Sequence, residues 1–153
     1  MIEQAKILCT ILGSFKFKKE IDLVREELED NKVTVLAPEK GSIYIPPSRR
    51  HILIPSSFRP LPSEKNKPIK QVENNFLRNI GISNFTYLVD IDGYVGPVVS
   101  MEMGFTIARE IPLYAKEKIN INLDPNPEWK ERVEKIPVMT PAEALKDFQE
   151  KNL

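Results

Sequence analysis

Apolar residues along the chain follow two spacings, one typical of buried strands and one typical of amphipathic helices. Five short apolar runs end at turn residues or prolines and predict strands: residues 5–12, 33–37, 84–92, 111–115 and 136–140. Apolar residues three or four positions apart predict helices over residues 18–30, 70–80, 98–109, around Trp129 and after Thr140. This alternation predicts one α/β domain over residues 1–153, a Rossmann or flavodoxin-like three-layer sandwich with a mostly parallel sheet of about five strands.

One long segment, residues 38–70, interrupts the alternation. It has no helical or strand period longer than a few residues, and it holds seven of the 13 prolines. From Gly41 to Lys70, six lysines and arginines stand against one glutamate, which gives a local net charge of +5. The segment is either a solvated loop or a lid in which Arg49 and Arg50 meet an anionic substrate.

The composition excludes several classes of protein. Lysine plus arginine and aspartate plus glutamate number 22 each, and this balance argues against a general nucleic-acid binder. With one cysteine, Cys9, and one histidine, His51, the chain has no disulfide framework and no Cys- or His-rich metal site, so we expect no metal and no cofactor. No apolar run reaches the roughly 18 residues of a membrane span, and the first residues lack the apolar core of a signal peptide. We therefore expect a cytoplasmic protein that binds no membrane.

Strand ends are the candidate binding sites, because ligands of open α/β sheets bind beyond the carboxyl ends of the strands. One candidate is the loop from Pro38. Another is the turn Gly13-Ser14-Phe15-Lys16-Phe17, which follows the first strand and leads into a helix. Backbone N–H groups at such a helix start are typical of an anion site, and also of an ordinary capped turn.

A third strand end carries carboxylates. Asp90 and Asp92 end the run at 84–92, and the turn Gly93-Tyr94-Val95-Gly96 leads into the next helix. The spacing predicts that this helix buries Val98, Met101, Phe105 and Ala108. Glu102 then lies beside the apolar stripe near the rim of the sheet, where it is either a nucleophile or base, or a surface residue that stabilises the helix start.

The order of these features resembles the nucleoside 2-deoxyribosyltransferase-like family, which includes 2′-deoxynucleoside 5′-phosphate N-hydrolase-like members. The matching segments cover roughly half of the chain: the Gly13–Phe17 turn, the strand ending at Pro38, the Ser83-Asn84 pair, the Gly93–Gly96 loop, and the block Glu102-x-Gly104-x-x-x-Ala108 before Pro112. The resemblance implies cofactor-independent N-glycosidic chemistry on a nucleoside or nucleotide, in a protein that forms a homo-oligomer.

The resemblance also implies roles for single residues. The family's glutamate at the position of Glu102 attacks C1′ of the sugar, and water or an acceptor base then resolves the glycosyl-enzyme. Phe15 or Phe17 is expected to stack on the base and Tyr94 to line the sugar pocket. Other expected ligand contacts are Gly13, Ser14, Lys16 and Gly96. The alternative is a non-catalytic nucleotide-binding or sensing domain on the same fold.

The chain departs from the family at several positions. Glu73-Asn74-Asn75 replaces an aspartate that aids base departure in relatives, and Asn84 stands where relatives have aspartate. Because residues two apart in a strand point the same way, we expect Asp90 and Asp92 to point into the site, with Asp92 as the acid and Asp90 orienting it or a sugar hydroxyl. The alternative is that both only cap the turn, as aspartate often does before glycine. The positive charge of residues 41–70 favours a 5′-monophosphate over a plain nucleoside.

Overall fold

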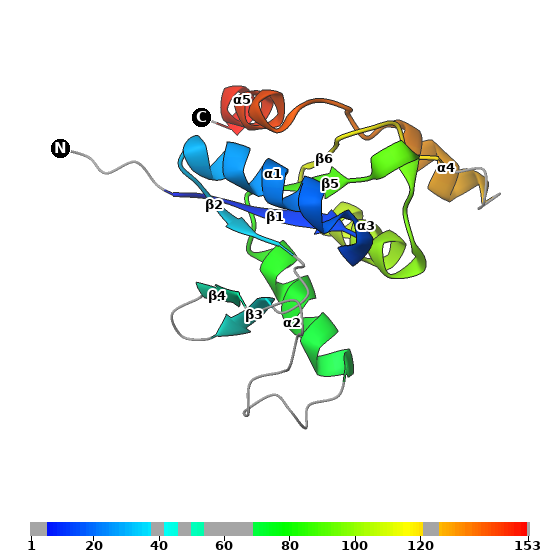
Figure 1. Cartoon of the computed structure of the whole chain (residues 1–153). Coiled ribbons are helices and arrows are strands. Elements are labelled where there is room, and N and C mark those ends of the chain that lie inside the picture. Colours follow the sequence, from blue (N-terminus) through cyan, green and yellow to red (C-terminus); the bar gives the residue numbers. More distant parts are fainter. Residues whose placement is uncertain (1–5, 38–41, 46–49, 54–68, 121–125, 153) are drawn as a thin grey trace.

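A computed structural model describes residues 6–37, 42–45, 50–53, 69–120 and 126–152. Its centre is a parallel four-stranded sheet in the order β2-β1-β5-β6. The strands are β1 (Ile7–Gly13), β2 (Val33–Leu36), β5 (Phe85–Val89) and β6 (Leu113–Ala115). Figure 1 shows the sheet between two layers of helices, which confirms the predicted three-layer α/β fold.

The strand order contains a topological switch point between β1 and β5. From β1 the chain crosses through α1 (Lys18–Asp30) to β2 on one side, whereas β5 and β6 lie on the other side. β5 pairs with β1 over its whole length, from Phe85 opposite Cys9 to Val89 opposite Gly13. The two strands therefore end at the same edge, and this is where open α/β sheets bind their ligands.

α1 and α5 (Pro141–Asn152) cover one face of the sheet, in blue and red in Figure 1. Their apolar stripes pack on alternate strand residues, and the helix residues buried there are Ile21, Val24, Leu28, Ala144, Leu145 and Phe148. The rings of Phe148 and Phe85 stack with their centroids 5.4 Å apart. Glu27 of α1 accepts the Ala142 N–H at 3.0 Å through Oε2, so α1 caps the start of α5.

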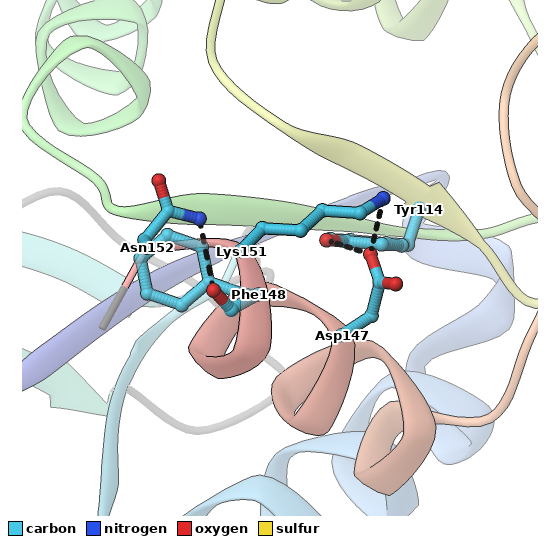
Figure 2. Close-up of polar contacts among 5 residues, drawn as sticks. All are labelled: Tyr114, Asp147, Phe148, Lys151 and Asn152. Carbon is cyan, nitrogen blue, oxygen red and sulfur yellow. Dashed lines mark hydrogen bonds and ion pairs between the residues drawn. The ribbon is translucent and has the colours of Figure 1, made fainter.

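Polar contacts hold α5 in place (Figure 2). The Tyr114 hydroxyl donates to Asp147 Oδ2 at 2.7 Å, and Lys151 Nζ lies 3.0 Å from the same oxygen. These two partners hold the pKa of Asp147 below its usual range. The helix predicted after Thr140 begins with a capping box, because Glu143 N–H donates to Thr140 Oγ1 and Thr140 N–H donates to Glu143 Oε1.

α2 (Ile69–Gly81) and α3 (Pro97–Ala108) cover the opposite face, and α4 (Pro127–Glu134) joins the same core. The apolar residues of this second core include Leu12, Ile80, Leu88, Val99, Met103 and Val133. Polar residues are buried here too. The hydroxyls of Thr10 and Ser83 are 2.6 Å apart, and Ser83 also donates to the Asn79 carbonyl at 2.7 Å.

The predicted fifth strand, residues 136–140, is only a parallel bridge between Val138 and Ala115. Ala115 N–H donates to the Pro137 carbonyl at 2.9 Å, and Met139 N–H donates to the Ala115 carbonyl at 3.0 Å. Proline has no N–H to continue the ladder, so the pairing stops after one residue. The described sheet therefore has four strands and not five.

The basic segment also differs from the prediction, since it contains a β-hairpin. β3 (Ser42–Ile45) pairs antiparallel with β4 (Arg50–Leu53). The prolines at positions 46, 47 and 55 flank these short strands and do not interrupt them. Among the helices that the structure describes, none has both the length and the apolar character needed to cross a membrane.

Candidate functional site

The candidate site lies at the switch point, where β1 and β5 end side by side. Gly13 is the last residue of β1, and a Cβ at this position would stand 3.0 Å from the Val89 carbonyl and 3.3 Å from Ile21 Cδ1. The close packing of β1 against β5 and α1 therefore requires glycine here. It brings the turn after β1 next to the turn after β5.

Three of the predicted binding residues meet at this edge. The turn after Ser14 is the short helix η1 (Phe15–Phe17), which the Phe17 N–H closes by donating to the Ser14 carbonyl at 2.9 Å. Lys16 Nζ lies 3.2 Å from the centroid of the Tyr94 ring, and Phe17 meets the same ring edge-on at 6.0 Å. The ammonium group can bind an anionic group of a ligand, and the two aromatic rings can stack on a flat group.

Asp90 follows the last residue of β5 and is 0% exposed. Its Oδ1 accepts the Glu117 N–H at 3.0 Å, which ties the end of β5 to the segment after β6. Its Oδ2 is buried and has no hydrogen-bond partner among the residues that the structure describes. Burial raises the pKa of Asp90 to about 7, mainly because the charged form loses its hydration.

Asp92 does not share the environment of Asp90, so the prediction that both point the same way is wrong. β5 ends at Val89, and residues Ile91–Gly93 form the short helix η2. Asp92 has φ 56° and ψ 24° within this turn and is exposed. The two-residue period of a strand does not apply beyond Val89, because the backbone has already turned.

The turn after Asp92 is packed against the segment that follows β6. Gly93 has φ +75°, and a Cβ there would stand 2.5 Å from the Lys118 carbonyl oxygen. Asn120 N–H donates to the Gly93 carbonyl at 2.9 Å. Tyr94 directly follows this turn, and Gly96 directly precedes the first residue of α3. The backbone contacts hold the start of α3 beside the switch point.

Glu102 lies in the second turn of α3 and is only 4% exposed. It belongs to the stripe of α3 that is buried, together with Val99, Met103 and Thr106. The Thr106 hydroxyl donates to the Glu102 carbonyl at 2.7 Å. The helix therefore directs its acidic side chain inward, as expected for a functional group and unusual for a glutamate that only stabilises a helix.

The predicted apolar face of α3 is wrong. Val98 is 56% exposed and Met101 is 49% exposed, and Ala108 is exposed as well. α3 is apolar on nearly all sides, so the helical spacing fits more than one stripe, and the sheet selects the stripe that contains Glu102.

The arginines predicted to bind phosphate are not placed at the site. Arg49 lies outside the described residues, and Arg50 is known as the first residue of β4. Their role stays a prediction.

Two residues of the family-like pattern serve the fold. Asn84 lies at the amino end of β5, where its Oδ1 accepts the Leu8 N–H at 2.8 Å and its own N–H donates to the Leu8 carbonyl at 2.8 Å. Ser83 bonds within the buried cluster under α2. They lie at the opposite edge of the sheet from Asp90, which follows the carboxyl end of β5. Sequence reasoning also missed Glu117, whose backbone N–H anchors Asp90.

The fold and the polar residues at the switch point define an open α/β domain of the flavodoxin-like type. The chain matches the crystal structure of a conserved protein from Enterococcus faecalis V583 with a TM-score of 0.58 and 13% sequence identity, over 96% of this chain and 99% of that one. Searches against family models and curated proteins find no match. The structural likeness supports the fold of the whole chain.

Proposed function

We propose that this protein cleaves or transfers the N-glycosidic bond of a deoxynucleoside or its 5′-monophosphate, with Glu102 as the nucleophile. The observation that carries the proposal is the position of Glu102, a glutamate 4% exposed on the sheet-facing stripe of the helix that starts at the switch point. Burial of a carboxylate destabilises the folded protein, so few carboxylates are buried without a function. Catalytic carboxylates are often found among those that are buried.

The proposed reaction uses two steps at the same carbon. A Glu102 oxygen attacks C1′ as the base departs, and water or a second base then displaces the glutamate. In this proposal Lys16 binds the phosphate, and Phe17 and Tyr94 pack against the base or sugar. The contacts of Lys16 and Phe17 with the Tyr94 ring support these roles. The nucleophile and the binding residues lie in segments that follow the two strands at the switch point.

A non-catalytic nucleotide-binding or sensing domain is the second candidate. One observation favours it. The first turn of α3 consists of Pro97, Val98 and Val99, and no side chain caps its start at Gly96. These first three residues offer no hydroxyl or carboxylate to hold the sugar, so a ligand could bind here and stay intact.

Self-association is also part of the proposal. Val98 and Met101 are exposed large apolar residues on α3, and Glu102, the one charged residue within that helix, faces inward. A second copy of the chain would cover this apolar surface. Met101→Glu should then lower the molar mass measured by light scattering, whereas Lys146→Glu on α5 should leave it unchanged. An unchanged mass in Met101→Glu would contradict this surface as the interface.

The experiment that tests the reaction is a substrate panel. The protein is incubated with deoxynucleosides and their 5′-monophosphates, with and without a free acceptor base, and the products are separated by chromatography. Released base indicates a hydrolase, and an exchanged base indicates a transferase. Saturable binding by calorimetry with neither product favours the binding domain and rejects the catalytic proposal.

A further inference from the structure

Asp90 is a buried carboxyl group, and only one of its two oxygens accepts a hydrogen bond from the described residues. Oδ1 accepts the Glu117 N–H at 3.0 Å, whereas Oδ2 is buried without a hydrogen-bond partner in the described part of the chain. An unpaired buried oxygen destabilises the folded state, and native structures contain few of them. The retention of this one at a ligand-binding edge therefore calls for a functional explanation.

The surroundings of Asp90 determine its protonation. Loss of hydration raises its pKa to about 7, the Glu117 carboxylate acts in the same direction, and the N–H groups of Glu117 and Lys116 oppose the shift. A carboxyl group with this pKa holds its proton part of the time at neutral pH, as a general acid must.

Asp92 is not buried in this way. It is exposed and has a positive φ within the turn after β5. The protein does not enclose an exposed side chain together with a leaving base. The acid expected at Asp92 from the sequence thus fits Asp90 better.

We propose that Asp90, through Oδ2, hydrogen-bonds the base of the nucleotide and passes it a proton as the base leaves. The inference rests on the proposed function. As the C1′–N bond breaks, its electron pair goes to the base nitrogen and the Oδ2 proton moves to an acceptor atom of the base. A Glu102 oxygen forms the new bond to C1′. Water or an acceptor base then attacks C1′, the bond to Glu102 breaks, and the proton of the attacking O–H or N–H returns to Asp90.

The base reaches Oδ2 only if side chains at this edge move, because Oδ2 is buried. Tyr94 is the neighbouring candidate for such a movement, since it lies four residues beyond Asp90 and is 40% exposed with Lys16 on its ring. Binding of an anionic substrate group to Lys16 would release that ring.

The test compares two leaving groups. One substrate is the monophosphate cleaved best in the panel, whose base needs a proton to depart. The other is 4-nitrophenyl 2-deoxyribose 5-phosphate, whose 4-nitrophenolate departs without one. Asp90→Asn keeps the shape and the acceptor for Glu117, and Asp92→Asn is the matched control in the same turn.

Asp90→Asn should lower kcat on the monophosphate about 100-fold or more and change turnover of the nitrophenyl substrate by less than about threefold. Asp92→Asn should leave both unchanged. Equal losses on the two substrates, or no loss on either, would overturn the inference. If Asp90→Asn does not fold by circular dichroism, the wild type decides: kcat on the monophosphate should fall above about pH 7, and kcat on the nitrophenyl substrate should not. The same fall with both substrates, or with neither, would overturn it. A wild type that cleaves neither substrate rejects the proposed function, and the inference with it.

Discussion

Polar residues at the two edges of the parallel sheet differ in how they are hydrogen-bonded. At the amino edge, Asn84 and Leu8 exchange two hydrogen bonds of 2.8 Å, one through the Asn84 side chain. At the carboxyl edge, Asp90 keeps a buried oxygen without a partner, and Asp92 and Gly93 have positive φ values. At the amino edge, the fold itself supplies the hydrogen-bond partners of these polar groups.

The difference teaches where stability and function lie in this chain. Side chains at the amino edge replace backbone partners, so the fold alone explains why they are there. At the carboxyl edge the fold carries an unpaired carboxyl oxygen and backbone strain that a purely structural role does not require. Variants at the two edges should therefore separate stability from activity.

The largest expected effect is on the pH dependence of stability at Asp90. The pKa is about 7 in the folded protein and 3.8 for the ordinary group, so between these values the folded state holds a proton that the unfolded state has lost. The contribution of Asp90 to the free energy of unfolding is therefore full below about pH 4 and is lost as the pH rises through 7, on the order of 4 kcal/mol in total. Asp90→Asn should lack this loss.

Urea unfolding of the wild type and Asp90→Asn at pH 4, 5.5, 7 and 8 measures the effect. The difference between the two proteins should shift in favour of the variant as the pH rises. Parallel curves would show that Asp90 has an ordinary pKa.

The next effect is on catalysis at Glu102. Glu102→Gln keeps the size of the side chain and removes the nucleophilic carboxylate, so base release should fall at least about 100-fold, or about 2.7 kcal/mol in activation free energy. The exposed Glu110→Gln at the end of α3 serves as the control and should keep wild-type turnover. Single-turnover kinetics with the monophosphate would measure both, and wild-type rates in Glu102→Gln would reject the nucleophile.

A smaller effect is expected near the amino edge, at the Thr10–Ser83 pair. Ser83→Ala removes the hydroxyl that bonds both Thr10 and the Asn79 carbonyl, which should lower the free energy of unfolding by about 1–2 kcal/mol. Turnover at a temperature well below the melting point should stay the same. A loss of kcat with unchanged stability would show that this cluster belongs to the site.

The smallest effect is expected at Asn84. Asn84→Ala leaves the Leu8 N–H without its side-chain acceptor near the surface, and this should cost about 0.5–1 kcal/mol in thermal or urea unfolding. Asn84→Asp restores an acceptor and should recover most of that loss. If Asn84→Asp instead changes turnover, the family-like aspartate acts on the chemistry and the division between the edges is wrong.

The sequence predicts most of the architecture because most of the helices have a clear apolar period and the strands are short apolar runs that end at turn residues or prolines. α1, with Ile21, Val24 and Leu28, is confirmed at residues 18–30, and the capping box at Thr140 marks the start of α5. The face of α3 was not predictable in this way. A helix apolar on all sides carries no periodic signal, so only the sheet decides that Glu102 is buried and Met101 exposed.

The end of β5 was equally hidden. The residues from Phe85 to Ile91 include no glycine or proline that would mark the end of a strand, and β5 ends at Val89, where its partner β1 ends at Gly13. A neighbouring strand sets this limit, and the residues of β5 alone do not reveal it. Asp90 and Asp92 lie in different environments because β5 ends at Val89. Since the sequence of β5 does not show this end, it predicts the same direction for both side chains.

The contact between Glu27 and Ala142 has a consequence for how the chain folds during synthesis. It joins residues 115 positions apart, and α5 supplies Ala144, Leu145 and Phe148 to the core that also contains Cys9 and Ile11. α5, which is synthesised after all four strands of the sheet, therefore packs on β5, where Phe148 stacks on Phe85. Until the ribosome releases α5, the part of this face that α1 does not cover stays open to chaperones and to other nascent chains, and a truncation that removes α5 leaves that part exposed.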